Sequence, residues 1–194
     1  GLAGWPVAAE ERMIQRDLEI QARVGGHLHV CHISTAGAVE LVRRAKAHGL
    51  RVTAEVTPHH LHLTDELLRT GDTAAKVNPP LRPREHVEAC RRGLADGTID
   101  IVATDHAPHT AADKDGGFAA AAFGLIGMET SVPLALELVD GGVIGPLRLI
   151  EAMSTAPARV FGLPGGSLAP GAVADVTMID PRDPHTIDPS AFRS

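Results

Sequence analysis

Short apolar runs and amphipathic segments alternate along the chain. Residues 27–33, 51–57 and 99–104 are short runs with β-branched residues, and each leads into ionisable or polar side chains. Residues 35–48 and 85–96 instead repeat apolar residues at the spacing of a helix with one buried face. Strands that alternate with helices are typical of a parallel sheet. The pattern therefore predicts an α/β fold in which three adjacent parallel strands bring their carboxyl ends to one rim.

A carboxylate follows the third of these runs. Residues 101–103 are apolar, Asp105 follows after Thr104, and Pro108 prevents the strand from continuing. A carboxylate at such a strand end can bind a metal ion or transfer a proton, although an isolated aspartate can also cap the following turn. His32 ends the first run in the same way, which favours a shared site at the rim.

Five blocks of sequence carry a resemblance to a known family. They are His-Val-Cys-His-Ile-Ser-Thr (29–35), Val-Thr-Ala-Glu-Val-Thr-Pro-His-His (52–60), Lys-Val-Asn-Pro-Pro-Leu-Arg (76–82), Ala-Thr-Asp-His-Ala-Pro-His-Thr (103–110) and Phe-Gly-Leu-Ile-Gly-Met-Glu-Thr (123–130). In this order they resemble the class I dihydroorotases, which are cyclic amidohydrolases within the metal-dependent hydrolases. The flanking segments 4–6 and 168–176 agree with this resemblance.

The resemblance implies a fold and a division of the chain. Residues 1–160 would form strands six to eight of a (β/α)₈ TIM-type barrel, and residues 161–194 would form part of a small β-sandwich, with a late strand at 168–176. A complete barrel takes about 250 residues. The metal-binding residues of the family's strands one, four and five have no counterpart here. We therefore expect a carboxyl-terminal fragment that is inactive alone.

The resemblance also implies a metal centre. His32 matches a metal ligand at the end of strand six, and Asp105 matches the aspartate of strand eight that binds metal and transfers protons. Cys31 and Glu55 match positions beside the metal, where they would support the ligands. The expected cofactor is Zn²⁺, which accepts imidazole and carboxylate ligands; the intact family holds two ions, and one of the two sites is incomplete in this chain.

Substrate contacts are implied at four further positions. Asn78 matches a residue that contacts the substrate ring, while His109, Phe123 and Gly124 match positions that hold its amide and carboxylate groups. The implied reaction is the metal-dependent, reversible hydrolysis of dihydroorotate to carbamoyl aspartate in pyrimidine biosynthesis. An allantoinase or dihydropyrimidinase-like amidohydrolase, and a non-catalytic dihydroorotase-like protein that binds a partner, are the alternatives.

The remaining histidines are expected to have structural or surface roles. His27 and His29 alternate with apolar residues, so their side chains should leave the strand on the face opposite to His32. The pair His59 and His60 is expected to support a loop. His106 should point away from the site, because it is the neighbour of Asp105 along the strand end.

Composition limits the kinds of partner that the chain is expected to bind. The chain has 194 residues, of which 44% are hydrophobic, and a net charge of −6, which predicts a globular protein and argues against nucleic acid and anionic membranes as partners. No segment reads as a signal peptide or membrane span. Cys31 and Cys90 do not make a disulfide framework, so a cytoplasmic protein is expected. A homo-oligomer, or association with aspartate carbamoyltransferase, is the protein partner that the resemblance suggests.

Overall fold

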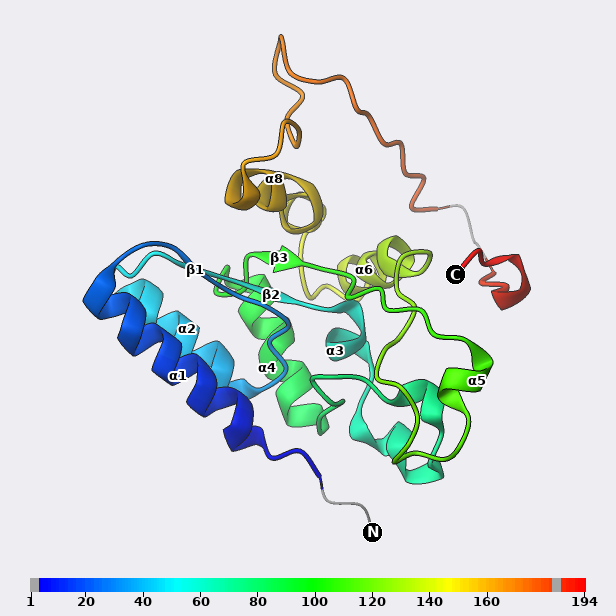
Figure 1. Cartoon of the computed structure of the whole chain (residues 1–194). Helices are drawn as coiled ribbons and strands as arrows, with labels where there is room; N and C mark the ends of the chain where they lie inside the picture. The colour runs from blue at the N-terminus through cyan, green and yellow to red at the C-terminus, as the bar shows by residue number, and fades with distance from the viewer. Residues whose placement is uncertain (1–3, 183–185) are drawn as a thin grey trace.

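Three parallel strands form the centre of the protein (Figure 1). A computed structural model describes residues 4–182 and 186–194. In it β1 (Leu28–Val30) pairs with β2 (Val52–Val56), and β2 pairs with β3 (Ile101–Val102), both in parallel. The order β1-β2-β3 confirms the prediction that the three apolar runs are adjacent parallel strands.

Three long helices lie together on one side of these strands (Figure 1). They are α1 (Val7–Val24), α2 (Ala36–Ala47) and α4 (Arg84–Ala95), and α2 packs against both others. Thr35 caps the start of α2, because its side chain accepts a hydrogen bond from the Ala38 amide. The helix ends before Gly49, which has φ +77°. The helices α2 and α4 confirm the two amphipathic segments predicted from the sequence.

The core lies between the strands and these helices. Its fully buried members come mainly from β2, from the turn after β1, from the turn before β3 and from the inner faces of α2 and α4; they include Ile33, Ala38, Val42, Ala54, Val56, Cys90, Leu94 and Ile99. Each helix contributes residues one turn apart, so the buried stripe of each faces the sheet.

Shorter elements connect and follow the strands. Between β2 and α4 lie α3 (Pro58–His62), η1 (Asp65–Thr70) and η2 (Thr73–Ala75). After β3 come α5 (Ala111–Lys114), α6 (Ser131–Asp140), α7 (Pro146–Ile150), the π-helix η3 (Glu151–Thr155) and α8 (Ala156–Phe161). The segment 115–130 crosses between α5 and α6 without regular structure, apart from turns and a single bridge between His106 and Leu125.

The carboxyl-terminal segment differs from the expectation. Within residues 163–182 and 186–194 the only regular element is the short helix η4 (Pro189–Ala191), so the predicted strand at 168–176 does not form. The chain after α8 first runs away from the helices and strands (Figure 1), and Leu168 is 83% exposed. At the end of the chain the Ser194 hydroxyl donates to the Glu129 carboxylate. A strand needs a neighbour for its backbone hydrogen bonds, and the described residues supply none there. The expected strand is therefore absent from this structure, and the β-sandwich stays a prediction.

No helix in the described ranges is both long enough and apolar enough to cross a membrane. Cys31 and Cys90 are both free thiols, as the sequence predicted.

Candidate active site

Two of the expected metal ligands meet at the carboxyl end of the sheet. His32 follows β1 and Asp105 follows β3, and the His32 Nε2 atom lies 3.6 Å from Asp105 Oδ1. Both residues have positive φ angles, +52° and +46°, which no other described non-glycine residue shows. The chain therefore leaves the extended conformation at both places and turns the two side chains toward each other.

Glu55 lies in β2, between the strands that lead to His32 and Asp105, and connects one further histidine, His29, to the site. Its Oε1 lies 2.8 Å from His32 Nδ1, and its Oε2 lies 3.0 Å from His29 Nε2. Burial opposes ionisation of Glu55, which is 6% exposed, but the two imidazoles outweigh it and lower the pKa of its carboxyl to about 2. The same contact raises the pKa of His32, whereas burial raises the pKa of Asp105.

The donor atoms fit a divalent metal ion. Two ligands of a tetrahedral zinc ion lie roughly 3.3 Å apart, given zinc–ligand bonds of about 2.0–2.1 Å, and the His32–Asp105 separation of 3.6 Å is close to that value. The His32 Nδ1 atom is also buried, and its close contact with Glu55 does not have hydrogen-bond geometry, so it has no hydrogen-bond partner among the described residues.

A second donor group lies beside the first. One ligand atom each of His29, Cys31 and Glu55 fall within 4.8 Å of one another, which is close enough to surround a single ion. Although Cys31 is exposed, partial desolvation of its thiol and the charge of Glu55 raise the pKa of that thiol. Cys31 and Glu55 therefore lie together with His29, and their place beside a metal ion stays a prediction.

His29 corrects one expectation. Alternation along a strand placed it on the face opposite to His32, yet both imidazoles contact the carboxylate of Glu55. The strand ends at Val30, and the positive φ of His32 reverses the direction of its side chain, so alternation does not apply across that point. The usable signal was the i, i+2 spacing from His29 to Cys31, because residues two apart share one face of a strand.

His59 and His60 are part of the interior. The His60 ring lies 2.7 Å from Thr57 Oγ1 and 3.0 Å from the Pro79 carbonyl oxygen, and so ties α3 to the segment that carries Asn78. Burial lowers the pKa of His60 to about 4 and that of His59 to about 2. The two contacts of His60 agree with the expected role of this residue in supporting a loop.

The expected substrate residues lie on two segments. Asn78 is exposed, and its side chain has no hydrogen bond within the described chain. His109 and Phe123 are joined, because His109 Nε2 lies 2.8 Å from the Phe123 carbonyl oxygen. Gly124 has φ +148°, and a Cβ atom there would come within 2.6 Å of the Ala107 carbonyl oxygen and 2.8 Å of the His109 ring, so only glycine fits.

His106 has a role that sequence patterns did not indicate. Its Nδ1 accepts hydrogen bonds from the backbone amides of Gly127 and Met128, at 3.1 and 3.2 Å. These bonds fix the far end of the segment 115–130, and the direction of His106 relative to the His32–Asp105 pair stays a prediction. No residue pattern identifies a contact of this kind, which joins positions 21 and 22 residues apart.

Comparisons with known proteins agree with this arrangement. The profile of the "Amidohydrolase family" matches residues 8–193. The dihydroorotase of Pelotomaculum thermopropionicum is 53% identical over 195 residues, and that of Streptomyces coelicolor is 49% identical over 197; each alignment covers all of this chain and 46% of the relative. The resemblance predicted from the five sequence blocks is therefore confirmed, and the chain spans about half the length of the curated relatives it matches.

Solved structures show the same fold. The L-hydantoinase of Arthrobacter aurescens superimposes with a TM-score of 0.82 at 35% identity, over 87% of this chain and 39% of the hydantoinase. The dihydropyrimidinase of Brevibacillus agri gives a TM-score of 0.84 at 27% identity, over 87% of this chain and 39% of that enzyme. With the strand-end donors, the family profile and these folds in agreement, the chain belongs to the amidohydrolase family.

Proposed function

We propose that this chain is the carboxyl-terminal part of a zinc-dependent dihydroorotase, which opens the cyclic amide of dihydroorotate to carbamoyl aspartate and also catalyses the reverse reaction. The observation that supports this most strongly is the pair His32 and Asp105, 3.6 Å apart at the ends of two parallel strands. The similarity to dihydroorotases over the whole chain favours the same substrate. In this proposal residues 1–160 contribute strands six to eight of a (β/α)₈ barrel, and residues 161–194 belong to a β-sandwich.

Asp105 is the proposed catalytic residue. A divalent metal ion, when bound, acidifies a water molecule and polarises a carbonyl group. Asp105 accepts the proton of the attacking water and returns it to the ring nitrogen as the amide bond breaks, so the proton ends on the leaving group. Burial raises the pKa of Asp105, which makes its carboxylate a better proton acceptor than an exposed aspartate. His32 contributes a ligand and, through Glu55, joins the two donor groups.

Substrate binding is assigned to the two segments described above. The free amide of Asn78 and the backbone at Phe123 and Gly124 would orient the ring, and His109 would hold an anionic group of the substrate while fixing Phe123. The proposed partners are this small molecule and, at the protein level, a further copy of the chain or an aspartate carbamoyltransferase.

A dihydropyrimidinase-like activity is the second candidate. The superposition on L-hydantoinase and dihydropyrimidinase favours it, because these enzymes share the fold of this chain. The sequence identity to dihydroorotases is higher, at 53% against 35% for the hydantoinase. A protein that only binds a partner is the third candidate, and the close approach of His32 and Asp105 argues against it.

Turnover measurements on the longer protein separate these candidates. The protein that contains this chain together with the rest of the barrel should hydrolyse dihydroorotate, with little turnover of dihydrouracil or allantoin. Asp105→Asn keeps the shape of the side chain but cannot accept the proton, so turnover should fall by about a thousandfold or more while the fold is retained. Faster turnover of dihydrouracil would favour the second candidate, and no turnover of any substrate the third.

A further inference from the structure

Lys114 directs its ammonium group at backbone carbonyl groups. Its Nζ lies 2.6 Å from the oxygen of Gly124, 3.0 Å from that of Ala122, and 3.2 Å from those of Thr73 and Lys76. Within the described ranges it forms no ion pair with a carboxylate. Burial and the neighbouring charge of Lys76 lower the pKa of Lys114. The dipoles of these carbonyl groups stabilise the charge of Lys114, which in turn holds the loop of residues 118–124.

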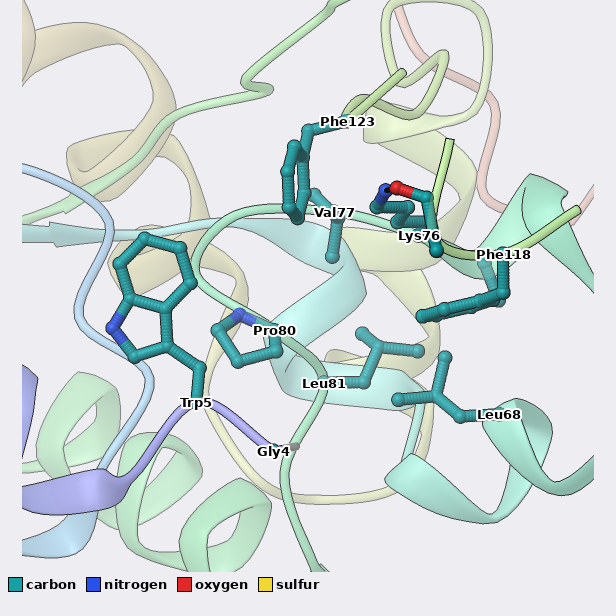
Figure 2. A pocket seen from close by; sticks show the side chains of 11 residues that line it. Gly4, Trp5, Leu68, Lys76, Val77, Pro80, Leu81, Phe118 and Phe123 are labelled. Carbon is teal, nitrogen blue, oxygen red and sulfur yellow. Dashed lines mark hydrogen bonds between the residues drawn. The ribbon is translucent and has the colours of Figure 1, made fainter. Parts of the chain in front are cut away.

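Lys76 holds the same loop from a second side. It is 6% exposed, and its Nζ donates to the carbonyl oxygens of Ala121, at 2.6 Å, and Ala119, at 3.0 Å. The ammonium also lies 4.3 Å from the centre of the Phe123 ring and 5.7 Å from that of Phe118, and Figure 2 shows the lysine between these two rings. Cation–π contacts of this kind stabilise both the charge and the orientation of the ring.

Apart from the contact of His109 with the Phe123 carbonyl oxygen, the loop of residues 118–124 has few other bonds. Its backbone amides make only a few bonds to the body of the protein, among them Gly124 to the Lys76 carbonyl and Ala122 to the Asp113 carbonyl. One side of the loop borders a cavity of about 270 Å³, lined by Trp5, Phe118 and Phe123 among others (Figure 2), which leaves room for the loop to move. The two ammonium groups therefore supply most of the contacts that fix its carbonyl groups.

We propose that Lys76 and Lys114 are positioning residues. Together they form a clamp: their ammonium groups bind the backbone carbonyl groups of residues 118–124 and so set Phe123 and Gly124 against the substrate. This inference rests on the proposed function for its kinetic consequence, but the clamp itself is a structural property. Lys76 lies two residues before Asn78, so one short segment carries both a substrate side chain and the lysine that holds the opposite loop. The two substrate-binding segments are thereby joined.

The clamp can be tested without any activity. In the 194-residue chain, Lys114→Met should speed hydrogen exchange of the Ala122 and Gly124 amides by on the order of ten- to one-hundredfold, because bonds from a charged donor are lost. Trp5 is the only tryptophan, and its ring lies edge-on to Phe123 with the ring centres 6.5 Å apart. Acrylamide should therefore quench the Trp5 fluorescence more strongly in the variant. Lys46→Met is the matched control: it breaks the ion pair with Asp100 and should leave the loop unchanged.

A conservative variant and kinetics complete the test. Lys114→Arg keeps the charge and should restore slow exchange in part; it also serves if the methionine variant does not fold. In the longer enzyme, Lys114→Met should raise KM by about tenfold or more with kcat and metal content nearly unchanged, and Lys114→Arg should lower KM again. Unchanged exchange in a folded Lys114→Met variant, or a loss of kcat at constant KM, would overturn the clamp. If the unmodified enzyme fails to turn over dihydroorotate, the proposed function is wrong, and the exchange result still decides on the clamp.

Discussion

His32 reaches the candidate metal centre because its backbone turns immediately after β1. At φ +52° its side chain no longer follows strand alternation, and its imidazole contacts both Asp105 and Glu55. His27, five residues earlier, is exposed, and its Nε2 atom lies 2.8 Å from the Thr53 hydroxyl. Two histidines of the same short segment therefore have very different surroundings, and this difference can be measured.

Replacing His32 by alanine should lower the zinc content of the longer protein strongly, because a first ligand and the link to Glu55 are lost together. His27→Ala is the matched control and should keep the zinc content of the unmodified protein. Elemental analysis after dialysis against a weak chelator gives both values. Equal zinc content in the two variants would remove His32 from the metal centre.

The sequence was sufficient to predict some residues of the candidate site and not others. His32 and Asp105 could be predicted because each follows an apolar strand and lies in a family block. His29 could not, since its contact with Glu55 depends on where β1 stops, and a local pattern does not fix a strand end to one residue. Lys76 and Lys114 were missed for a different reason: their partners are backbone carbonyls, which carry no sequence signal.

At the scale of elements, α3 depends on a buried, uncharged histidine. His60 joins Thr57 to Pro79, and burial holds its pKa near 4, below the ordinary value of 6.5. Between pH 6.5 and pH 4 the unfolded chain binds a proton at this position and the folded chain does not. The free energy of unfolding must therefore fall as the pH falls through this range.

We expect His60 to contribute a loss on the order of 2 kcal/mol between pH 7 and pH 5. Urea unfolding followed by Trp5 fluorescence at a series of pH values measures it. His60→Gln keeps a polar side chain but does not titrate, and should reduce the pH dependence to the part that the buried His59 contributes. His48→Gln, at an exposed helix end, is the matched control. The same slope in the His60 variant and the unmodified chain would exclude His60 as its source.

The elements themselves were predictable where the signal is local. Helices α2 and α4 follow from periodic apolar residues, and the parallel order of the strands follows from the helices between them. The expected strand at 168–176 fails because a strand is defined by its neighbour, which the described residues do not provide. Long-range pairing is therefore the property that a resemblance alone could not establish.

On the scale of the whole molecule, the cooperative unit lies in the strands and the helices that cover them. Leu94 is fully buried in that core, whereas Leu168 is 83% exposed in the carboxyl-terminal segment. Leu94→Ala should lower the free energy of unfolding by about 2–5 kcal/mol, and Leu168→Ala by about 0.5 kcal/mol or less. Denaturant unfolding of the two variants compares them directly. A similar loss in both would mean that the carboxyl-terminal segment packs on the core in solution.

The 194-residue chain alone should not hydrolyse dihydroorotate. In the described structure β1 and β3 each pair with a single neighbour, so both outer edges of the sheet are open. The pair His32 and Asp105 supplies two ligands, whereas a catalytic zinc ion usually has three from the protein. The purified chain should bind zinc weakly and exchangeably. Turnover comparable to that of an intact relative, and abolished by a chelator, would contradict this and require ligands from a second copy.

The left-handed backbone at His32 and Asp105 lowers the stability of the fold, although the side chains of these two residues are the candidate metal ligands. Holding a side-chain-bearing residue in this conformation costs about 1–3 kcal/mol, and glycine adopts it with far less strain. A variant library selected only for survival at high temperature would therefore gain from glycine at both positions and lose both donors. Under the proposed function, engineering of a more robust enzyme from this scaffold has to retain these two residues deliberately and seek its added stability elsewhere.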